Sequence, residues 1–382
     1  MRYKQVWTGI LAGLGLLALI LDGQTALEGG RAGIDFCIRT VIPSLFPFFL
    51  LSGLLTDALS GSSLSMLRPL GKLCRIPQGA ESLLIPGFLG GYPVGAQCIA
   101  AAYRAGQLPK EDAQRMLAFC NNAGPAFLFG MIASLFPHAA LGWALWGIHV
   151  ASALLTALLI PGYPVSRVNV VNDQKRSVSG TLHASLQVMA TVCGWIILFR
   201  VLIAFLKKWV LWAFPVHYQT AFIGFLELSN GCYELPSVPD LGLRFLICSG
   251  ILAFGGLCVT MQTVSVTRGL SLRFYFLGKA LQTLFSITIC VGILVENWIF
   301  FLLALLACGI LLRKKQKKEW ILPAGSCIMD TPIHGGRCDA VSKKNRTLLC
   351  LLPAWGTPGG WTDSLHEKRT AHRRRQMLEV YL

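Results

Sequence analysis

Two apolar segments of this chain are interrupted by glycine and polar residues, which restricts how either segment can fold. The first contains Gly87-Phe88-Leu89-Gly90-Gly91-Tyr92-Pro93-Val94-Gly95, and the second contains Gly224-Phe225-Leu226-Glu227-Leu228-Ser229-Asn230-Gly231. A lipid-exposed backbone must satisfy its hydrogen bonds internally, so a polar, helix-breaking stretch at membrane depth normally lines a cavity enclosed by protein. A pair of such stretches in corresponding halves of a chain indicates a binding site.

The composition supports a membrane setting for both segments. The chain has 382 residues, of which 54% are hydrophobic and 14% charged, whereas an average soluble protein is about 25% charged. Most of the 13 cysteines stand alone inside apolar runs and none forms a C-x-x-C pair, so we expect neither a disulfide framework nor a metal site. The sequence therefore predicts an all-α, polytopic membrane protein without a cofactor.

The net charge of +16 does not indicate nucleic acid as a partner. Residues 313–382 hold 14 Lys and Arg against 6 Asp and Glu, so half of the excess lies in the tail. Most of the remainder lies in short loops, as expected for a protein whose partner is the lipid bilayer.

Runs of about 17 to 25 mostly apolar residues predict about eight transmembrane helices. They cover residues 6–21, 36–55, 116–136, 139–160, 184–206, 243–263, 274–295 and 298–312. The interrupted segments 83–103 and 219–232 are predicted to be re-entrant. The chain then divides into a first helix and loop (1–34), a first half (35–160), a cytoplasmic linker (161–183), a second half (184–312) and a basic, disordered cytoplasmic tail (313–382).

Loop charges predict the topology, because Lys and Arg concentrate in short cytoplasmic loops. Both flanks of segment 83–103 are basic, whereas residues 232–243 carry Glu234 and Asp240 without Lys or Arg. The two halves then have opposite orientations, which predicts an inverted repeat with both chain termini in the cytoplasm. Lys207 and Lys208 fall on the outer side and violate the rule; we attribute this to snorkelling beside Trp209 and Trp212.

Polar groups inside these segments predict a solute site. Glu227 is the outstanding residue, because an ionisable side chain in an apolar membrane segment is costly and by default functional. Ser229 and Asn230 add a hydroxyl and an amide. Asn121-Asn122 precede a Gly-Pro break inside span 116–136, whose counterpart we place at Ser249-Gly250, with Gly255-Gly256 further along, before Gln262. The full predicted set is Gly87, Gly90, Gly91, Tyr92, Gly95, Gln97, Asn121, Asn122, Glu227, Ser229, Asn230 and Gln262.

Each of these residues has a plainer interpretation. The glycines at 87, 91 and 95 fit close packing between helices. Glu227 could lie in water in an external loop, and the two asparagines could bond to neighbouring helices in a packed kink. His149 is expected to be a hydrogen-bonded core residue, and no catalytic motif is present, so an enzyme is not predicted.

With these residues in view, the chain resembles the sporulation integral membrane proteins of the YlbJ type, in the nucleoside-recognition (Gate domain) superfamily. The matching stretches are Leu45 to Phe49, Gly87 to Ala96, Phe119 to Pro125, Glu227 to Gly231 and Gly255 to Gln262. The resemblance covers about residues 35–312. It implies two Gate-like halves in a multi-pass protein of the bacterial cytoplasmic membrane that is required for the spore envelope.

Two functions remain open. The first is a transporter or gated pore for a small polar solute, nucleoside-like or an ion, with a coupling cation as a further candidate partner. The second is a non-transporting scaffold for assembly of the spore envelope. The solute, the coupling ion and any homo-oligomer are left open by the sequence.

Overall fold

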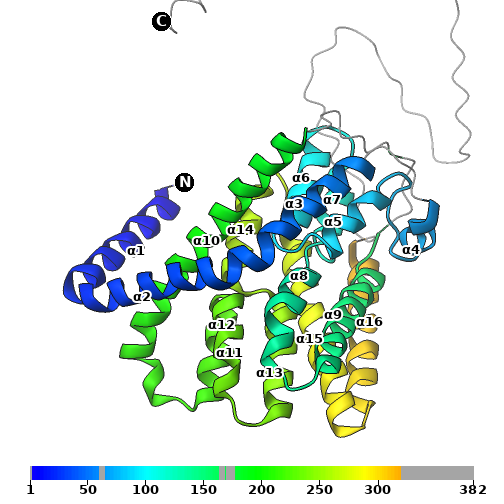
Figure 1. The fold of residues 1–382 in the computed structure, drawn as a ribbon. Helices are drawn as coiled ribbons and strands as arrows, with labels where there is room; N and C mark the ends of the chain where they lie inside the picture. Colours follow the sequence, from blue (N-terminus) through cyan, green and yellow to red (C-terminus); the bar gives the residue numbers. More distant parts are fainter. Residues whose placement is uncertain (1, 60–64, 163–167, 169–176, 320–382) are drawn as a thin grey trace, which may run out of the picture. The chain divides into compact units, whose positions relative to one another are not determined.

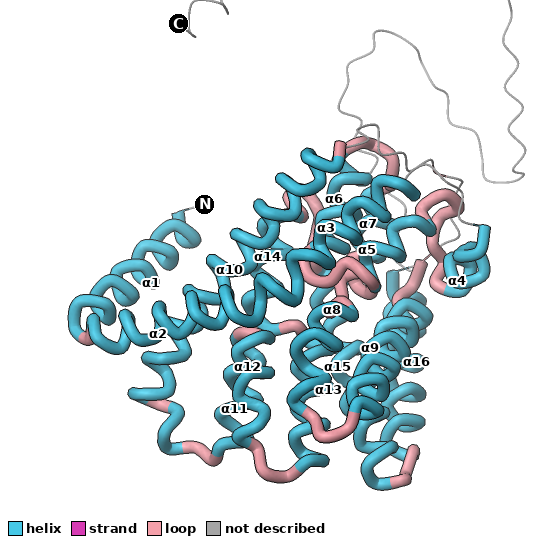
Figure 2. The backbone as a smooth tube through the Cα atoms, viewed as in Figure 1, coloured by secondary structure: helices cyan, strands magenta, loops and turns pink. Residues whose placement is uncertain are grey.

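The described part of the chain is built from helices joined by turns (Figures 1 and 2). The computed structural model describes residues 2–59, 65–162, 168 and 177–319, and no strand occurs in these ranges. Most of the predicted linker and all of the tail beyond residue 319 lie outside them. The helices are α1 (Arg2–Leu21), α2 (Gly23–Phe36), α3 (Ile42–Leu59), α4 (Arg68–Leu73), α5 (Leu84–Phe88), α6 (Val94–Arg104), α7 (Lys110–Met116), α8 (Pro125–Phe127), α9 (Ala139–Leu159), α10 (Val178–Trp209), α11 (Val216–Leu226), α12 (Leu228–Glu234), α13 (Leu241–Phe254), α14 (Gly256–Val266), α15 (Arg273–Val295) and α16 (Ile299–Glu319).

The predicted all-α, polytopic fold is confirmed. Five described helical segments are long and apolar enough to cross a membrane: Gly23–Ala58, Ala139–Leu159, Val178–Trp209, Leu241–Val266 and Arg273–Val295. Three shorter apolar segments, Val6–Leu21, Pro125–Leu135 and Ile299–Ile310, account for the other predicted spans. The eight apolar runs of the sequence therefore correspond to eight apolar helical segments.

The helix that contains predicted span 36–55 begins much earlier than expected. Helices α2 and α3 are joined by a π-helical turn at Cys37–Val41, so that one helix runs over Gly23–Ala58. Its first part is too polar to be recognised as a span, but it packs closely along α10. A Cβ on Gly29 would lie 3.0 Å from the Cα of Val201, and one on Gly33 would lie 3.1 Å from the Cα of Ile197. Small residues allow this approach.

Predicted spans 116–136 and 243–263 are each interrupted. In the first, α7 ends at Met116 and α8 begins only at Pro125; Gly124 is extended (φ −78°, ψ 157°), as residues before proline prefer. In the second, α13 ends at Phe254 and is capped by Gly255, which adopts a left-handed φ of 84° that glycine tolerates. Of the two pairs named from the sequence, Gly255-Gly256 therefore interrupts the helix and Ser249-Gly250 does not.

The two glycine-broken segments form hairpins of short helices. In the first, α5 packs on α6 where a Cβ on Gly95 would lie 2.9 Å from the Cα of Gly87. In the second, α11 packs on α12 where a Cβ on Gly231 would lie 2.2 Å from the Cα of Gly224. In both hairpins, therefore, glycine allows the two arms to touch.

Each hairpin also packs on the interrupted helix that follows it. A Cβ on Gly95 would lie 2.2 Å from the carbonyl oxygen of Cys120, and one on Gly224 would lie 2.2 Å from Cδ1 of Ile251. Helices α4 to α7 lie toward the top of Figure 1, whereas the α10–α11 and α12–α13 connections lie at the bottom. The described part thus contains a hairpin plus broken helix twice.

Lys207 and Lys208, which violate the loop-charge rule, are neutralised by acidic partners. Nζ of Lys207 lies 2.7 Å from Oε1 of Glu234, and Nζ of Lys208 lies 2.7 Å from Oδ2 of Asp22. The hydrogen bond from Lys208 lowers the pKa of the Asp22 carboxyl below its ordinary value. The sequence did not indicate these partners, and the snorkelling of the two lysines stays a prediction.

Packing between the arms of the second hairpin predicts a sharp effect of one methyl group. We expect Gly231→Ala to lower the unfolding free energy by about 1–3 kcal/mol, the usual cost of overpacking. Thermal unfolding of the purified protein in detergent, followed by circular dichroism, measures this. Gly147→Ala is the control, because no atom lies within 4 Å of its Cβ position in α9. Equal stability of the two variants would contradict the packing argument.

Candidate functional site

A small cavity lies where the two hairpins meet. Its volume is about 40 Å³, and its walls come from α3, both hairpins, the α7–α8 break, α10 and α14. The polar side chains in its lining belong to Tyr92, Glu227, Ser229 and Gln262, and backbone of Gly90, Gly91 and Gly124 completes them. The apolar part of the wall is Leu45, Phe48, Phe49, Ala123, Ala126, Phe127, Val192, Ile196, Leu228 and Val259.

The volume of the cavity limits what it can hold. A volume of about 40 Å³ accommodates about three water molecules. Pockets for small organic ligands are typically about 300–1,000 Å³. The cavity as it stands therefore holds an ion or a few water molecules.

Glu227 is the ionisable group of this cavity. It is 2% exposed, which excludes the alternative that it lies in water in an external loop. Its Oε1 accepts the backbone N–H of Ser229 at 3.0 Å and its Oε2 accepts that of Asn230 at 2.6 Å, so that the carboxylate caps α12. A carboxylate can accept about four hydrogen bonds, and its remaining lone pairs suit a cation or a donor group.

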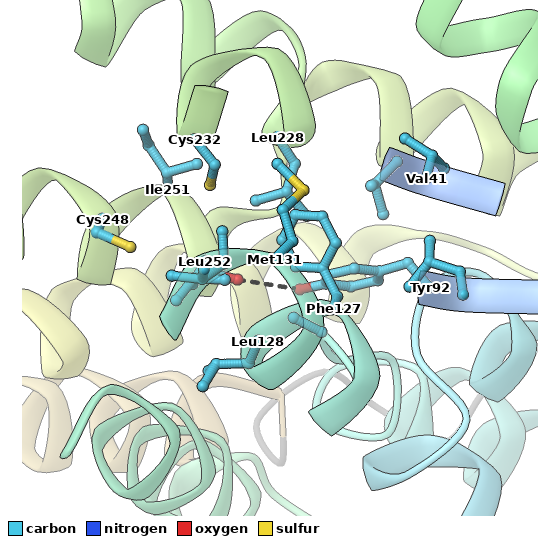
Figure 3. Close-up of a cluster of buried hydrophobic side chains, with 14 of the residues drawn as sticks. Val41, Tyr92, Phe127, Leu128, Met131, Leu228, Cys232, Cys248, Ile251 and Leu252 are labelled. Carbon is cyan, nitrogen blue, oxygen red and sulfur yellow. Dashed lines mark hydrogen bonds between the residues drawn. The ribbon is translucent and has the colours of Figure 1, made fainter. Parts of the chain in front are cut away.

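Tyr92 connects the first hairpin to the break between α13 and α14. Its hydroxyl donates to the carbonyl oxygen of Leu252 at 3.3 Å (Figure 3). A Cβ on Gly255 would lie 3.1 Å from Cζ of the Tyr92 ring, a tight contact, and the left-handed φ of 84° at Gly255 also disfavours a side chain there. Tyr92 thus lines the cavity and also closes the end of α13.

Asn121 and Asn122 do not line the cavity but belong to a second, fully buried polar cluster. Asn122 Nδ2 donates to the carbonyl oxygens of Gly87 and Phe119, at 3.1 and 2.7 Å. Asn121 Nδ2 donates to Oγ1 of Thr263 at 3.0 Å. In the same region, Nε2 of His149 accepts the backbone N–H of Ala123 at 3.1 Å. Asn122 and His149 therefore satisfy groups of the interrupted backbone, whereas Asn121 bonds to a neighbouring helix through Thr263 and its Oδ1 has no partner among the described residues.

Lys279 and Gln282 of α15 complete this cluster, and the sequence analysis missed both. Lys279 is 2% exposed and Gln282 is fully buried. Gln282 Nε2 donates to Oδ1 of Asn122 at 2.9 Å, and Lys279 Nζ donates to the Tyr92 hydroxyl at 2.9 Å. A lysine inside predicted span 274–295 was the available signal, since ionisable residues within spans are rare.

The remaining predicted residues have separate environments. Gly87 and Gly95 allow close packing against Cys120, and Gln97 is partly buried in α6, outside the cavity lining. The side chain of Asn230 turns toward α10, where its Oδ1 accepts from Nη1 of Arg200 at 3.1 Å. The structure thus gathers Gly90, Gly91, Tyr92, Glu227, Ser229 and Gln262 around one cavity. Among the described residues, no three His, Cys, Asp or Glu side chains are grouped so as to hold a metal ion.

The fold and this buried site define a class: a polytopic, all-α membrane protein with two broken helical hairpins that meet at a small, mostly apolar cavity with a few polar groups in its wall. Comparison with known proteins adds a relative. The chain is 27% identical over 319 residues to the sporulation integral membrane protein YlbJ of Bacillus subtilis (strain 168), covering 70% of this chain and 77% of the relative. This similarity confirms the resemblance to YlbJ-type proteins. No family model and no solved structure matches the chain.

The two hydrogen bonds of the Tyr92 hydroxyl predict a measurable effect on stability. We expect Tyr92→Phe to lower the unfolding free energy by about 1–3 kcal/mol, because the variant leaves the Leu252 carbonyl without its buried donor. Tyr233→Phe is the matched control, since its ring is 54% exposed. Thermal unfolding in detergent compares them, and a Tyr92→Phe variant as stable as the control would contradict a bonded role for the hydroxyl.

Proposed function

We propose that this protein is a transporter or gated pore for a small polar solute in the cytoplasmic membrane of a spore-forming bacterium. The observation that carries the proposal is that Glu227 is buried in the wall of a cavity between two hairpins of interrupted helices. Broken helices of this kind surround substrates and ions in transporters because their free backbone groups can bind polar atoms. We assign no catalytic role to the site.

Glu227, Ser229 and Gln262 supply a carboxylate, a hydroxyl and an amide to the same small space. This combination suits hydroxyl and amine donors of a solute, or a cation. The tyrosine ring offers a flat apolar face beside them. A nucleoside-like solute or an ion would use these groups, with Gly90 and Gly91 allowing the backbone to approach.

Binding of any solute larger than an ion requires the hairpins to separate. The arms of the second hairpin are in glycine-mediated contact, but only one residue, Glu227, joins α11 to α12. A movement of this hairpin as one body would open the cavity and carry the carboxylate with it. We therefore propose that the second hairpin is the gate.

We further propose that the two halves form an inverted repeat, with both chain termini in the cytoplasm. The repetition of a hairpin followed by a broken helix supports this, as do the positions of the flanking connections at opposite ends in Figure 1. The flanks of the first hairpin are basic. Beside the second hairpin, the lysines Lys207 and Lys208 are paired with acidic residues.

Cysteine accessibility tests this topology. Lys72→Cys and Lys110→Cys are expected to react with a membrane-impermeant maleimide only after cells are permeabilised, and Ser237→Cys in intact cells. The ten described native cysteines are buried or partly buried, and Cys327, Cys338 and Cys350 would be replaced by serine. Labelling of positions 72 and 110 from opposite sides would remove both the re-entrant hairpin and the inverted repeat.

Transport is tested with purified protein in liposomes. We expect Glu227→Gln to reduce uptake or binding of the transported solute at least tenfold, because one charge-assisted contact is worth about 1.5–3 kcal/mol. Radiolabelled nucleosides and monovalent cations form the panel. Glu234→Gln is the matched control, since Glu234 pairs with Lys207 outside the cavity lining. Unchanged flux of every solute that the protein carries would exclude Glu227 from the mechanism.

The relative's name places that protein in sporulation, and we propose the same context here, with a role in forming the spore envelope. The alternative is a scaffold that acts through protein partners. Complementation of a sporulation defect distinguishes the two. Loss of complementation by Glu227→Gln but not by Glu234→Gln favours transport, whereas full complementation by both variants favours the scaffold.

A further inference from the structure

The ammonium group of Lys279 lies in a cage of oxygen atoms without a carboxylate. Its Nζ donates to the carbonyl oxygen of Asn121 at 2.8 Å, to Oε1 of Gln282 and the Tyr92 hydroxyl at 2.9 Å each, and to the carbonyl oxygen of Ala253 at 3.4 Å. No acidic side chain of the described residues forms an ion pair with it. The positive charge is thus held by neutral oxygens only.

Hydrogen-bond directions around the cage fix the two side-chain oxygens, of Gln282 and Tyr92, as acceptors toward Lys279. Asn122 Nδ2 must donate to two carbonyl oxygens, so its Oδ1 accepts from Gln282 Nε2, and Oε1 of Gln282 is left to accept from Lys279. The Tyr92 hydroxyl uses its proton on Leu252 and also accepts. Three acceptors lie 2.8–2.9 Å from Nζ, one for each N–H donor of a charged ammonium, and the Ala253 carbonyl is a fourth, longer contact at 3.4 Å.

Two of the four oxygens come from the chain breaks. Ala253 lies in the last turn of α13, before Gly255. Asn121 follows the hydrogen-bonded turn that ends at Cys120. Carbonyl groups at the ends of helices lack helical partners and carry partial negative charge. Oxygen sets of this type bind free monovalent cations in membrane proteins with broken helices.

The packing of α15 holds the ammonium firmly in this position. A Cβ on Gly278 would lie 2.2 Å from the carbonyl oxygen of Ala118, so the helix backbone is in contact with the segment that precedes Asn121. Lys279 also lies 4.8 Å from the centre of the Tyr92 ring. The cation therefore joins both breaks and the first hairpin.

We propose that Lys279 is a built-in cation that occupies a monovalent-cation site formed by the two chain breaks. The protein consequently needs no dissolved cation at this position, and removal of the side chain creates a site for sodium, potassium or a primary ammonium ion. This inference concerns the cluster behind Tyr92 and is independent of whether the cavity carries a solute.

Chemical rescue of Lys279→Ala tests the proposal. The atoms that this substitution removes correspond to n-propylammonium. Full-length protein in detergent is therefore titrated with n-propylammonium chloride, NaCl or KCl, and N-methylglucamine chloride keeps the ionic strength constant. We expect its melting temperature to be lowered by at least 5 °C and to be restored saturably by n-propylammonium or by one of the metal ions. Tetramethylammonium, which has no N–H donor, should not restore it.

Two controls decide the outcome. Lys208→Ala removes a lysine that pairs with Asp22 near the surface and should show no rescue by any of these ions. Wild-type protein should show no saturable response either. The proposal is overturned if tetramethylammonium rescues as well as n-propylammonium, if no ion rescues, or if Lys279→Met is as stable as wild type. If Lys279→Ala fails to fold, the wild-type protein and Lys279→Met decide the outcome. A saturable stabilisation of the wild type by sodium or potassium overturns the proposal. No such response of the wild type, together with instability of Lys279→Met, supports the proposal.

Discussion

The whole arrangement depends on satisfying backbone groups where helices stop inside an apolar interior. The last carbonyls of α13 are bonded by Tyr92 and Lys279, and the break before α8 is bonded by Lys279, Asn122 and His149. An unsatisfied buried peptide group costs roughly 1–3 kcal/mol. Without these side chains, the backbone groups at the breaks would be unsatisfied. The helices could then not stop at the place where the two hairpins meet, and the cavity would not form.

Polar residues at the centre of the protein therefore divide into two sets with different tasks. Lys279 and Asn122 bond to backbone carbonyls and to Gln282, whereas Asn121 donates to the Thr263 hydroxyl and its buried Oδ1 has no partner among the described residues. Glu227 caps α12 but keeps free lone pairs in the cavity wall, which makes it available to a ligand. Tyr92 belongs to both sets, because it lines the cavity and its hydroxyl bonds to Leu252 and Lys279.

Sequence reasoning recovered the spans and the two hairpins because apolar run length and helix breakers act locally. It named Ser249-Gly250 first and Gly255-Gly256 second as the counterpart of the first break, and only the second pair interrupts the helix. A Ser-Gly pair can continue a helix when the hydroxyl finds a partner, and Oγ of Ser249 lies 2.7 Å from Oγ of Ser286. It overlooked Lys279. It explained Lys207 and Lys208 by snorkelling, because the partners of these two lysines, Glu234 and Asp22, are remote in the chain.

An all-α membrane protein with two glycine-broken segments is thus set by composition and by local chain chemistry. Which polar groups face the cavity and which close the backbone was decided by tertiary contacts alone. Lys279 meets Tyr92 across 187 positions of the sequence and Asn121 across 158. No periodicity or motif encodes such a meeting, because it depends on how the hairpins, the broken helices and α15 pack together.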